Sequence, residues 1–348
     1  MPRWQSELAR AITDPAELLR ELELDAALLP AARAAAARFP LRVPRGFAAK
    51  MAKGDPGDPL LRQVLPLAAE LRSAPGFVAD PVGDRAVRAA PGVLHKYRGR
   101  ALLLVTGACA VHCRYCFRRE FPYTEAREGA SGWRPALDYL AGDSSLREAI
   151  LSGGDPLSLS DRRLGALLAA LERIPHLERL RIHSRLPVVL PERVDGGLLD
   201  LLARTRLRPV LVIHANHARE LDAPVRAALA RLAEIGVTLL NQSVLLRGVN
   251  DAATALVDLS EALFAARVLP YYLHLLDRVR GAAHFEVNET EAWTIMELLR
   301  QRLPGYLVPR LVREQPGQSA KTPVCGHRRR QFRRVEGVWP SVEVGARV

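Results

Sequence analysis

The sequence is short of cysteine, of aromatic residues and of long apolar runs. Only four of its 348 residues are cysteines, too few for the disulfide framework of a small secreted domain. No apolar run reaches the roughly eighteen residues that a membrane span requires. The N-terminal stretch also lacks the continuous apolar core of a signal peptide. Together these absences predict a soluble, cytoplasmic protein.

Hydrophobic residues make up 49% of the chain, enough to bury the core of one large domain with additions. The formal net charge is +12, and a positive field attracts anions such as nucleic acids or acidic proteins. Arginine is nevertheless spread over the whole chain, which favours an ordinary solvated surface. The one dense basic run, His327–Arg334, is typical of a flexible basic tail, and we hypothesise that Arg328 to Arg334 meets an acidic partner.

Three regions of the chain differ in their composition and apolar pattern. Residues 1–90 predict an extension of helices and loops, with helices at Glu17–Leu29 and Ala31–Arg38. Residues 91–302 alternate short apolar runs with amphipathic stretches, as parallel strand–helix units do. Residues 303–348 form a C-terminal segment. The six expected strands are Ala101–Thr106, Glu148–Ser152, Leu177–Ser184, Pro209–His214, Val237–Val244 and Val268–His274.

Helices are expected between and after these strands. The predicted helices are Trp133–Leu140, Asp161–Arg173, Gly196–Arg204, Arg219–Ile235, Ala252–Ala266 and Asn288–Arg302. Six repeats of strand and helix indicate an α/β protein with a partial, open (β/α)6 barrel rather than a closed eight-stranded one. In such a barrel the chemistry belongs at the C-terminal ends of the strands.

A cysteine motif directly follows the first expected strand: Cys109, Cys113 and Cys116 share one short loop. Three thiolates can bind three irons of a [4Fe-4S] cluster and leave the fourth iron open for a cosubstrate. A zinc site is the alternative, but closed structural zinc sites need a fourth ligand, and His112 is the only local candidate. The Cys-x3-Cys-x2-Cys spacing after a barrel strand favours the iron–sulfur cluster.

This motif resembles that of the radical S-adenosylmethionine (SAM) superfamily. Its members bind SAM on the open iron and generate a radical that removes a hydrogen from the substrate. A Ser-Gly-Gly-Asp turn after the second strand resembles the glycine motif that approaches the methionine end of SAM. Without the resemblance, these residues would be an ordinary turn and polar strand ends. The implied SAM contacts are Ser152, Gly153, Gly154, Asp155, His214 and Gln242.

A lysine on a loop with proline and glycine, Lys321, lies beyond the barrel. Its amine can form the Schiff base through which proteins hold pyridoxal phosphate, although a surface lysine in a turn is the default interpretation. The loop resembles the pyridoxal-lysine loop of the lysine 2,3-aminomutases, and the resemblance runs from about Phe39 to Val324. The matching segments are Leu94–Tyr97, Cys116–Arg119, Arg181–Pro187, Asn241–Asp251, Pro270–Asp277 and Glu314–Val324.

The resemblance implies a role for each residue that matches the family's cofactor site. Lys321 carries pyridoxal phosphate, and Lys96, Tyr97 and Arg100 hold its phosphate group. The family usually has arginine at the position of Lys96. The chain as a whole therefore resembles a partial radical SAM barrel with an N-terminal helical extension and a C-terminal pyridoxal-lysine segment.

The same resemblance implies the substrate contacts. Arg118 pairs with the substrate carboxylate, for which a planar guanidinium is suited because it can donate two parallel hydrogen bonds. Asp277 and Glu314 hold the distal ammonium of the substrate, and many relatives have aspartate at the second position. Two carboxylates attract the side chain of lysine and repel that of glutamate, so lysine is the expected substrate.

The ending of the chain resembles one branch of this family. Free-standing lysine aminomutases carry a zinc-binding extension with further cysteines beyond the barrel, whereas this chain has only Cys325 there. We expect Cys325 to be an apolar filler or a free thiol. With Leu41–Pro44 and Asp58–Val64, the compact ending resembles the branch that makes (R)-β-lysine for elongation factor P. The implied partners are lysine, elongation factor P, the synthetase-like enzyme that attaches the β-lysine, and an external electron donor. A homo-oligomer is compatible with the sequence.

Other functions remain as alternatives. A free-standing lysine 2,3-aminomutase would make β-lysine as a metabolite. A radical enzyme that methylates RNA is suggested by the net charge, but it would need two further cysteines where only Cys325 is available. We therefore expect no direct nucleic-acid partner. A non-catalytic scaffold is disfavoured because both cofactor loops are complete.

Overall fold

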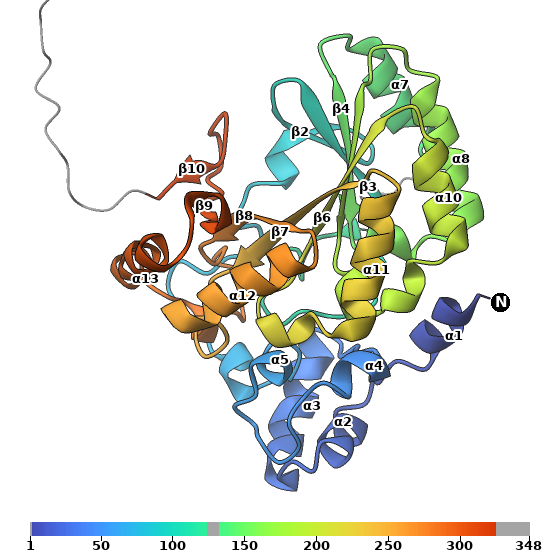
Figure 1. The fold of residues 1–348 in the computed structure, drawn as a ribbon. Coiled ribbons are helices and arrows are strands. Elements are labelled where there is room, and N and C mark those ends of the chain that lie inside the picture. Colours follow the sequence, from blue (N-terminus) through green and yellow to red (C-terminus); the bar gives the residue numbers. More distant parts are fainter. Residues whose placement is uncertain (1, 124–131, 325–348) are drawn as a thin grey trace, which may run out of the picture.

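The computed structural model describes residues 2–123 and 132–324 (Figure 1). The expectations for Cys325 and for Arg328 to Arg334 therefore lie outside the described residues. Within the described part, ten strands form one sheet in the order β1 to β10, and helices pack along it. The predicted α/β class is confirmed.

The strands β3 to β9 run parallel and form the partial barrel. Strand β2 pairs antiparallel with β3 in a hairpin, and β1 and β10 are antiparallel at the two ends of the sheet. The strands are β1 (Arg88–Ala90), β2 (Val93–Tyr97), β3 (Arg100–Thr106), β4 (Glu148–Gly153), β5 (Arg179–Ser184), β6 (Arg208–Ile213), β7 (Thr238–Val244), β8 (Leu269–His274), β9 (Arg310–Arg313) and β10 (Thr322–Pro323).

The sequence predicted six of the parallel strands and missed one. The six predicted runs coincide with β3 to β8 to within two residues at each end. Strand β9 was missed because only Leu311 and Val312 stand between two arginines, too short a pattern to indicate a strand. The partial barrel is thus confirmed, with one parallel strand more than expected.

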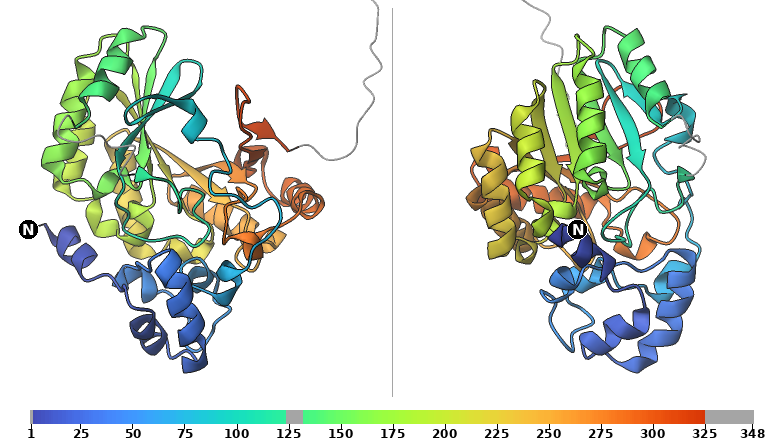
Figure 2. Two further views of the ribbon diagram at one scale, coloured as in Figure 1. Left: turned by 180° about the vertical axis from the view of Figure 1, so that it is seen from behind. Right: turned by 90° about the vertical axis from the view of Figure 1, so that its right-hand side faces the viewer.

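Helices cover the outer face of the parallel strands (Figures 1 and 2). Side-chain caps set where several of them begin, because a cap satisfies backbone N–H groups of the first turn. Asp222 accepts a hydrogen bond from the Val225 N–H, so the helix predicted from Arg219 begins at Ala223 instead. These helices are α7 (Arg134–Gly142), α8 (Asp161–Glu172), α9 (Leu186–Val189), α10 (Gly196–Arg204), α11 (Ala223–Glu234), α12 (Ala253–Ala265) and α13 (Glu289–Arg302).

The short helices of the N-terminal extension gather at one end of the barrel (Figure 2). The single helix expected over Glu17–Leu29 is wrong. The second helix ends at Glu21, Glu23 adopts a positive φ of 55°, and Asp25 caps a separate 3₁₀ turn. The elements are α1 (Arg3–Ala9), α2 (Pro15–Glu21), η1 (Ala26–Leu28), α3 (Leu29–Arg38), α4 (Arg45–Ala48), α5 (Pro59–Arg62) and η2 (Ala68–Leu71).

This extension holds the loop that carries the three cysteines. The carbonyl groups of Arg42 and Gln63 accept hydrogen bonds from the His112 and Arg114 N–H groups at 3.0 and 2.9 Å. The buried Arg114 side chain donates twice to the Glu70 carboxylate, at 2.8 and 2.6 Å. The cysteine loop is therefore fixed from outside the barrel as well as by the strand that precedes it.

A continuous apolar core supports the strands. All six residues of β4 are buried, as expected for a central parallel strand with both faces covered. Helix α8 contributes Leu164, Leu167, Leu168 and Leu171 to this core, at the spacing of one helical face. The packing holds the parallel strands in register, so that their C-terminal ends meet at one mouth.

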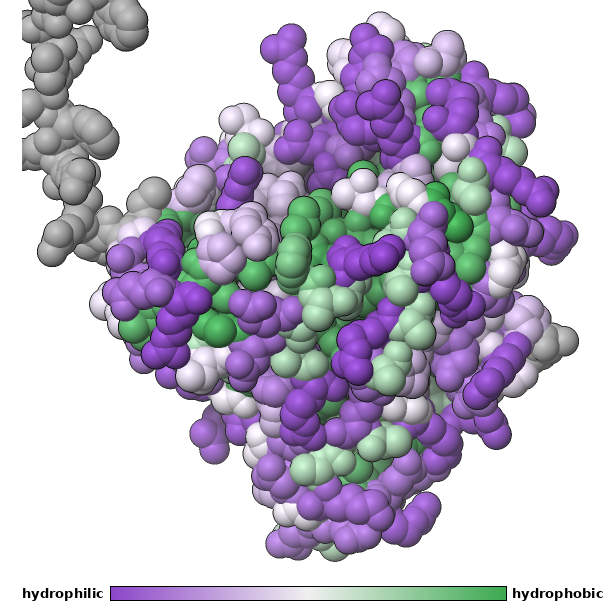
Figure 3. Space-filling model, in the orientation of Figure 1, coloured by the Kyte–Doolittle hydropathy of each residue, from purple (hydrophilic) through white to green (hydrophobic). Residues whose placement is uncertain are grey.

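Hydrophilic residues spread over the whole face seen in Figure 3, with apolar surface in patches between them. Among the described residues, no helix has both the length and the apolar character that crossing a bilayer requires.

We expect Glu70→Ala to lower the free energy of unfolding by about 3–5 kcal/mol, because it leaves the buried Arg114 charge without its carboxylate. The two side chains are 1% and 0% exposed. Chemical denaturation measures the loss. The control Glu297→Ala removes an ion pair with Arg300 whose members are 51% and 44% exposed, and should cost below about 1 kcal/mol. Equal losses in the two variants would contradict the role given to Glu70.

Candidate active site

The C-terminal ends of the parallel strands carry most of the residues that the sequence singled out. Strand β3 leads into the cysteine loop, β4 ends at Gly153, His214 follows β6 and Glu314 follows β9. Lys321 stands directly before β10, which pairs with β9. Because the strands are parallel, these ends face the same mouth of the barrel.

The three cysteines of the loop are partly exposed free thiols. Burial, followed by the charge of neighbouring groups, raises the pKa of Cys109 well above its ordinary value and that of Cys116 to about 11. Thiols in such surroundings ionise together only when a bound cation compensates their charge. The donor set therefore fits a metal cluster that binds three thiolates.

A zinc site finds less support at this loop. The Nδ1 atom of His112 lies 2.9 Å from the Pro40 carbonyl oxygen, and the His112 ring packs against Phe39. Within residues 2–123 and 132–324, no three His, Cys, Asp or Glu side chains converge as ligands of one metal ion. A [4Fe-4S] cluster does not require such convergence, because each thiolate binds a different iron.

The glycine motif packs against the cysteine loop. A Cβ atom on Gly154 would lie 2.3 Å from the Ala108 carbonyl oxygen. A Cβ atom on Gly153, whose φ is +115°, would lie 2.5 Å from the Thr106 carbonyl oxygen. Only glycine therefore lets the end of β4 touch the start of the cysteine loop. A contact between these glycines and SAM stays a prediction.

Asp155 and Ser152 already bind protein groups. The Asp155 carboxylate accepts hydrogen bonds from Ser184 Oγ at 2.7 Å and from the Arg185 N–H at 2.8 Å. Ser152 Oγ accepts one from Arg118 Nη1 at 3.0 Å. Asp155 thus braces the turn after β5, and Ser152 orients an arginine. Their predicted contacts with SAM stay predictions.

Three histidines approach one another inside the barrel. Gln242 Nε2 lies 2.9 Å from His214 Nε2, and the ring centroids of His214 and His183 are 6.1 Å apart. Burial lowers the pKa of His214 to about 3 and depresses those of His183 and His274 as well, so all three are neutral near pH 7.

Two of these histidines were missed by sequence analysis. The Nε2 atoms of His183 and His274 are buried and have no partner among the described residues. A buried polar atom without a partner is costly unless something binds it, so these atoms suit a cofactor or substrate. In the sequence His183 is one of several polar residues of β5 and His274 is the last residue of β8, so neither gives a signal of its own.

Glu314 holds the lysine that was predicted to carry pyridoxal phosphate. Lys321 Nζ donates to Glu314 Oε2 at 2.7 Å, and the Tyr97 hydroxyl donates to Oε1 at 2.5 Å. Lys96 Nζ lies 3.4 Å from the same Oε1, and the Arg100 guanidinium stacks 4.7 Å from the Tyr97 ring centroid. The four predicted pyridoxal residues therefore lie together.

Asp84, which the sequence analysis did not select, joins this cluster to the cysteine loop. One of its oxygens lies 2.8 Å from Lys96 Nζ, and the other accepts a hydrogen bond from Arg118 Nε at 2.8 Å. Arg118 stands two residues after Cys116 in the sequence. The resulting chain of contacts runs from this end of the cysteine loop to the lysine and comprises Arg118, Asp84, Lys96, Glu314 and Lys321. The thiol loop and the lysine thus face the same mouth.

Asp277 follows β8 and lies within electrostatic reach of this cluster. Desolvation raises its pKa to about 7, while the charge of Lys321 opposes the shift and that of Glu314 adds to it. An ammonium group beside the two acids would favour their ionised forms. This environment suits the predicted site for the distal ammonium of lysine.

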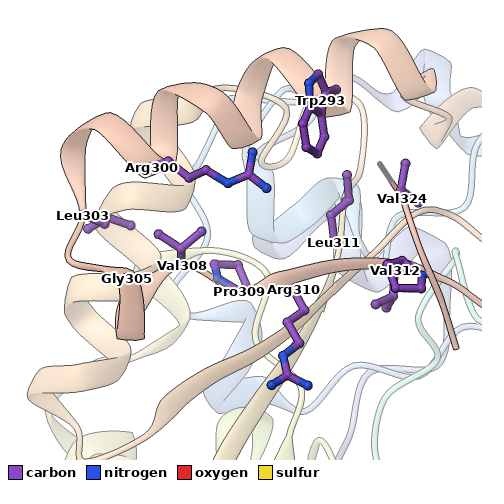
Figure 4. Close-up of a pocket in the computed structure, with 11 residues that line it drawn as sticks. Trp293, Arg300, Leu303, Gly305, Val308, Pro309, Arg310, Leu311, Val312 and Val324 are labelled. Carbon is purple, nitrogen blue, oxygen red and sulfur yellow. The ribbon is translucent and has the colours of Figure 1, made fainter. Parts of the chain in front are cut away.

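A separate pocket of about 560 Å³ lies between α13 and the strands β9 and β10 (Figure 4). Trp293 and Arg300 of α13 face Leu311 of β9 across it. None of the site residues predicted from the sequence lines this pocket. It is therefore distinct from the barrel mouth.

No family model matches the chain. It is 55% identical over 322 residues to the L-lysine 2,3-aminomutase of Escherichia coli (strain K12), covering 92% of this chain and 94% of that protein. With the L-lysine 2,3-aminomutase of Haemophilus influenzae the identity is 49%, covering 92% and 94%. With that of Clostridium subterminale it is 40%, covering 78% of this chain and 65% of the relative. Among solved structures, a radical SAM methyltransferase from Sphaerobacter thermophilus is 18% identical, with a TM-score of 0.43 over 64% of this chain and 68% of the other.

Asp277 should make the stability of the protein depend on pH. Its carboxyl binds a proton more tightly when folded, at a pKa of about 7, than at its ordinary value of 3.8. Wild-type stability should therefore fall, relative to Asp277→Asn, as the pH rises from about 4 to 7, by roughly 2–4 kcal/mol, and change no further above that. Urea unfolding of both proteins across this range measures the difference. A constant difference would show that Asp277 keeps its ordinary pKa.

Proposed function

This chain belongs to the family of L-lysine 2,3-aminomutases and is an isomerase, and we propose that it converts L-lysine to (R)-β-lysine with a [4Fe-4S] cluster, SAM and pyridoxal phosphate. The observation that carries the proposal is the chain of contacts from Arg118, two residues after Cys116, to Lys321. It supports one reaction site in which the source of the radical and the tethered amino acid are neighbours.

The cysteine loop would hold the cluster and SAM. Cys109, Cys113 and Cys116 would each bind one iron, and the fourth iron would take the amino and carboxylate groups of SAM. The three cysteines share one loop, which backbone contacts with Arg42 and Gln63 hold in place, and this arrangement supports a cluster there. The further contacts with SAM would come from Ser152, Gly153, Gly154, Asp155, His214 and Gln242.

The cluster around Glu314 would hold pyridoxal phosphate. Lys321 would carry the cofactor, and Lys96, Tyr97 and Arg100 are the donors that a phosphate group prefers. When bound, the cluster with SAM supplies a radical that abstracts hydrogen, and pyridoxal phosphate supplies an aldehyde that attaches to an amino group. The remaining task of the chain is to orient lysine between them.

Substrate lysine would be held at both ends. Arg118 would bind the carboxylate, sharing its guanidinium with Asp84 and Ser152, which orient it in the structure. Asp277 and Glu314 would bind the distal ammonium; once the Lys321 amine engages the cofactor, Glu314 loses that cation and is available to another. Two-point attachment matters, because a small misplacement can cost on the order of a hundredfold in rate.

The proposed destination of the product is elongation factor P, through a synthetase-like partner that attaches β-lysine. The chain is 55% identical to its Escherichia coli relative and 40% identical to the Clostridium one, which supports the branch of the Escherichia coli protein. Segments Leu41–Pro44 and Asp58–Val64, which resemble that branch, supply the carbonyl groups that bind the cysteine loop. A free-standing enzyme that makes β-lysine as a metabolite is the alternative.

The function is tested with Lys321→Ala. After anaerobic reconstitution with iron, sulfide, SAM, pyridoxal phosphate and reductant, we expect wild type to turn lysine into an isomer identified as β-lysine by mass analysis of its fragments. The variant should lose the pyridoxal absorbance and at least about a thousandfold of the activity, because no other group replaces the tether. Its iron–sulfur spectrum should be unchanged.

The matched control is Lys53→Ala, since Lys53 is an exposed lysine paired with Glu23. It should keep full pyridoxal absorbance and activity. Retention of both properties by Lys321→Ala would remove Lys321 from the role proposed for it.

The destination is tested by comparing two substrates. If the product serves elongation factor P, the synthetase-like partner should transfer the enzyme's product to the factor faster than it transfers L-lysine. Mass analysis of the modified factor measures both rates. Equal transfer of the two amino acids, with efficient turnover of free lysine, would favour the alternative of a metabolic aminomutase.

A further inference from the structure

Arg185 occupies a buried position beside the cysteine loop, outside the predicted substrate site. It directly follows β5, and its side chain is 4% exposed. Its Nη1 atom donates to Cys113 Sγ at 2.7 Å. Its Nη2 atom donates to Gln63 Oε1 at 2.5 Å and to Glu220 Oε2 at 3.0 Å. The guanidinium thus joins a cysteine of the loop to a buried carboxylate.

Several elements hold this arginine in place. Asp155 Oδ2 accepts a hydrogen bond from the Arg185 N–H, which fixes the backbone. The guanidinium carbon lies 5.5 Å from the Phe47 ring centroid and 5.7 Å from that of Tyr115. Swinging the side chain away would leave a charge in an apolar environment, so its contact with the cysteine loop is built in.

The charge balance around Arg185 leaves room for an anionic sulfur. Glu220 is its carboxylate partner, and that carboxylate also accepts hydrogen bonds from Gln63 Nε2 and from the Asn216 and His217 N–H groups. The Glu220 carboxylate is therefore shared among several donors. The Arg185 guanidinium binds it through Nη2 and points Nη1 at Cys113. A thiolate there would complete the pairing of a buried arginine.

Cys113 differs from the other two thiols because it accepts a hydrogen bond from a charged side chain. The cationic side chains that lower the pKa of the other two thiols act through their charge: Arg42 on Cys109, and Arg118 with Arg119 on Cys116. Within the described part of the chain, Cys113 is the cysteine for which a hydrogen bond from a charged side chain is found. One corner of the cluster would therefore carry a positive charge at close range.

We propose that Arg185 is a positioning residue that holds the Cys113 thiolate and raises the reduction potential of the cluster. The inference rests on the proposed function, since it requires a cluster on the three cysteines. Reduction transfers one electron from an external reductant to the cluster, with no bond made or broken. A fixed cation and hydrogen-bond donor at a ligating sulfur stabilises the added negative charge.

The test is the midpoint potential of the reconstituted cluster in Arg185→Met, measured by mediated titration with dithionite and electron paramagnetic resonance. Methionine fills much of the same space without charge or donor. We expect the equilibrium constant for reduction to fall about tenfold, which is about 59 mV for a one-electron couple. Arg185→Lys, which keeps the charge, should lie between the two.

A second variant predicts a change of opposite sign. Glu220→Gln removes the competing negative charge and keeps one oxygen, which can still accept the hydrogen bonds from Gln63, Asn216 and His217, so the potential should rise. It decides the question even if Arg185→Met fails to fold. The matched control is Arg193→Met: Arg193 is fully buried, pairs with Asp161 and stacks on Trp4, but belongs to a different contact network. Its potential should equal that of wild type.

Two outcomes would overturn the inference, and they are distinguishable. A wild-type protein that binds no iron–sulfur cluster would remove the proposed function and this inference together. A wild-type cluster whose potential is unchanged in both Arg185→Met and Glu220→Gln would overturn the role of Arg185 alone. A shift of equal size in Arg193→Met would also overturn it, because the effect would then follow from any buried arginine.

Discussion

The two halves of the site depend on one buried carboxylate. Asp84 pairs with Lys96 on the side of the predicted pyridoxal site and with Arg118 on the side of the cysteine loop. Both bases lower its pKa against the opposing effect of burial, so it is ionised at neutral pH. Losing it would leave the buried Arg118 without its carboxylate partner and Lys96 with Glu314 alone. Nothing else in the described contacts links the two halves so directly.

The cysteine loop is constrained from the N-terminal extension as well as from the barrel. Glu70 binds Arg114 between the second and third cysteines, and Gln63 reaches both the backbone of that loop and the side chain of Arg185. Ala110 and Val111 anchor the loop in the apolar core. Its polar contacts reach segments distant in the sequence, so the extension is part of the site.

The sequence predicted the features that depend on a repeated pattern or on the spacing of nearby residues. Strands β3 to β8, the cysteine loop and the lysine loop followed from apolar periodicity, from cysteine spacing and from a family resemblance. Asp84, Arg185 and His274 did not, because a single polar residue acquires a role only when folding brings a partner to it. Strand β9 was not predicted for a related reason. Its two apolar residues form too short a pattern, and the strand is stabilised by its pairing with β8.

The resemblance to the lysine 2,3-aminomutases implies two departures that offset each other. It implies arginine at the position of Lys96, and lysine has a shorter reach and no planar fork of donors. It implies aspartate in many relatives at the position of Glu314, whose side chain is longer by one methylene. In the structure the longer acid closes the gap: Glu314 Oε1 lies 3.4 Å from Lys96 Nζ while Oε2 still accepts from Lys321. Because one carboxylate contacts both bases, the cation at position 96 and the acid at position 314 are best regarded as one unit.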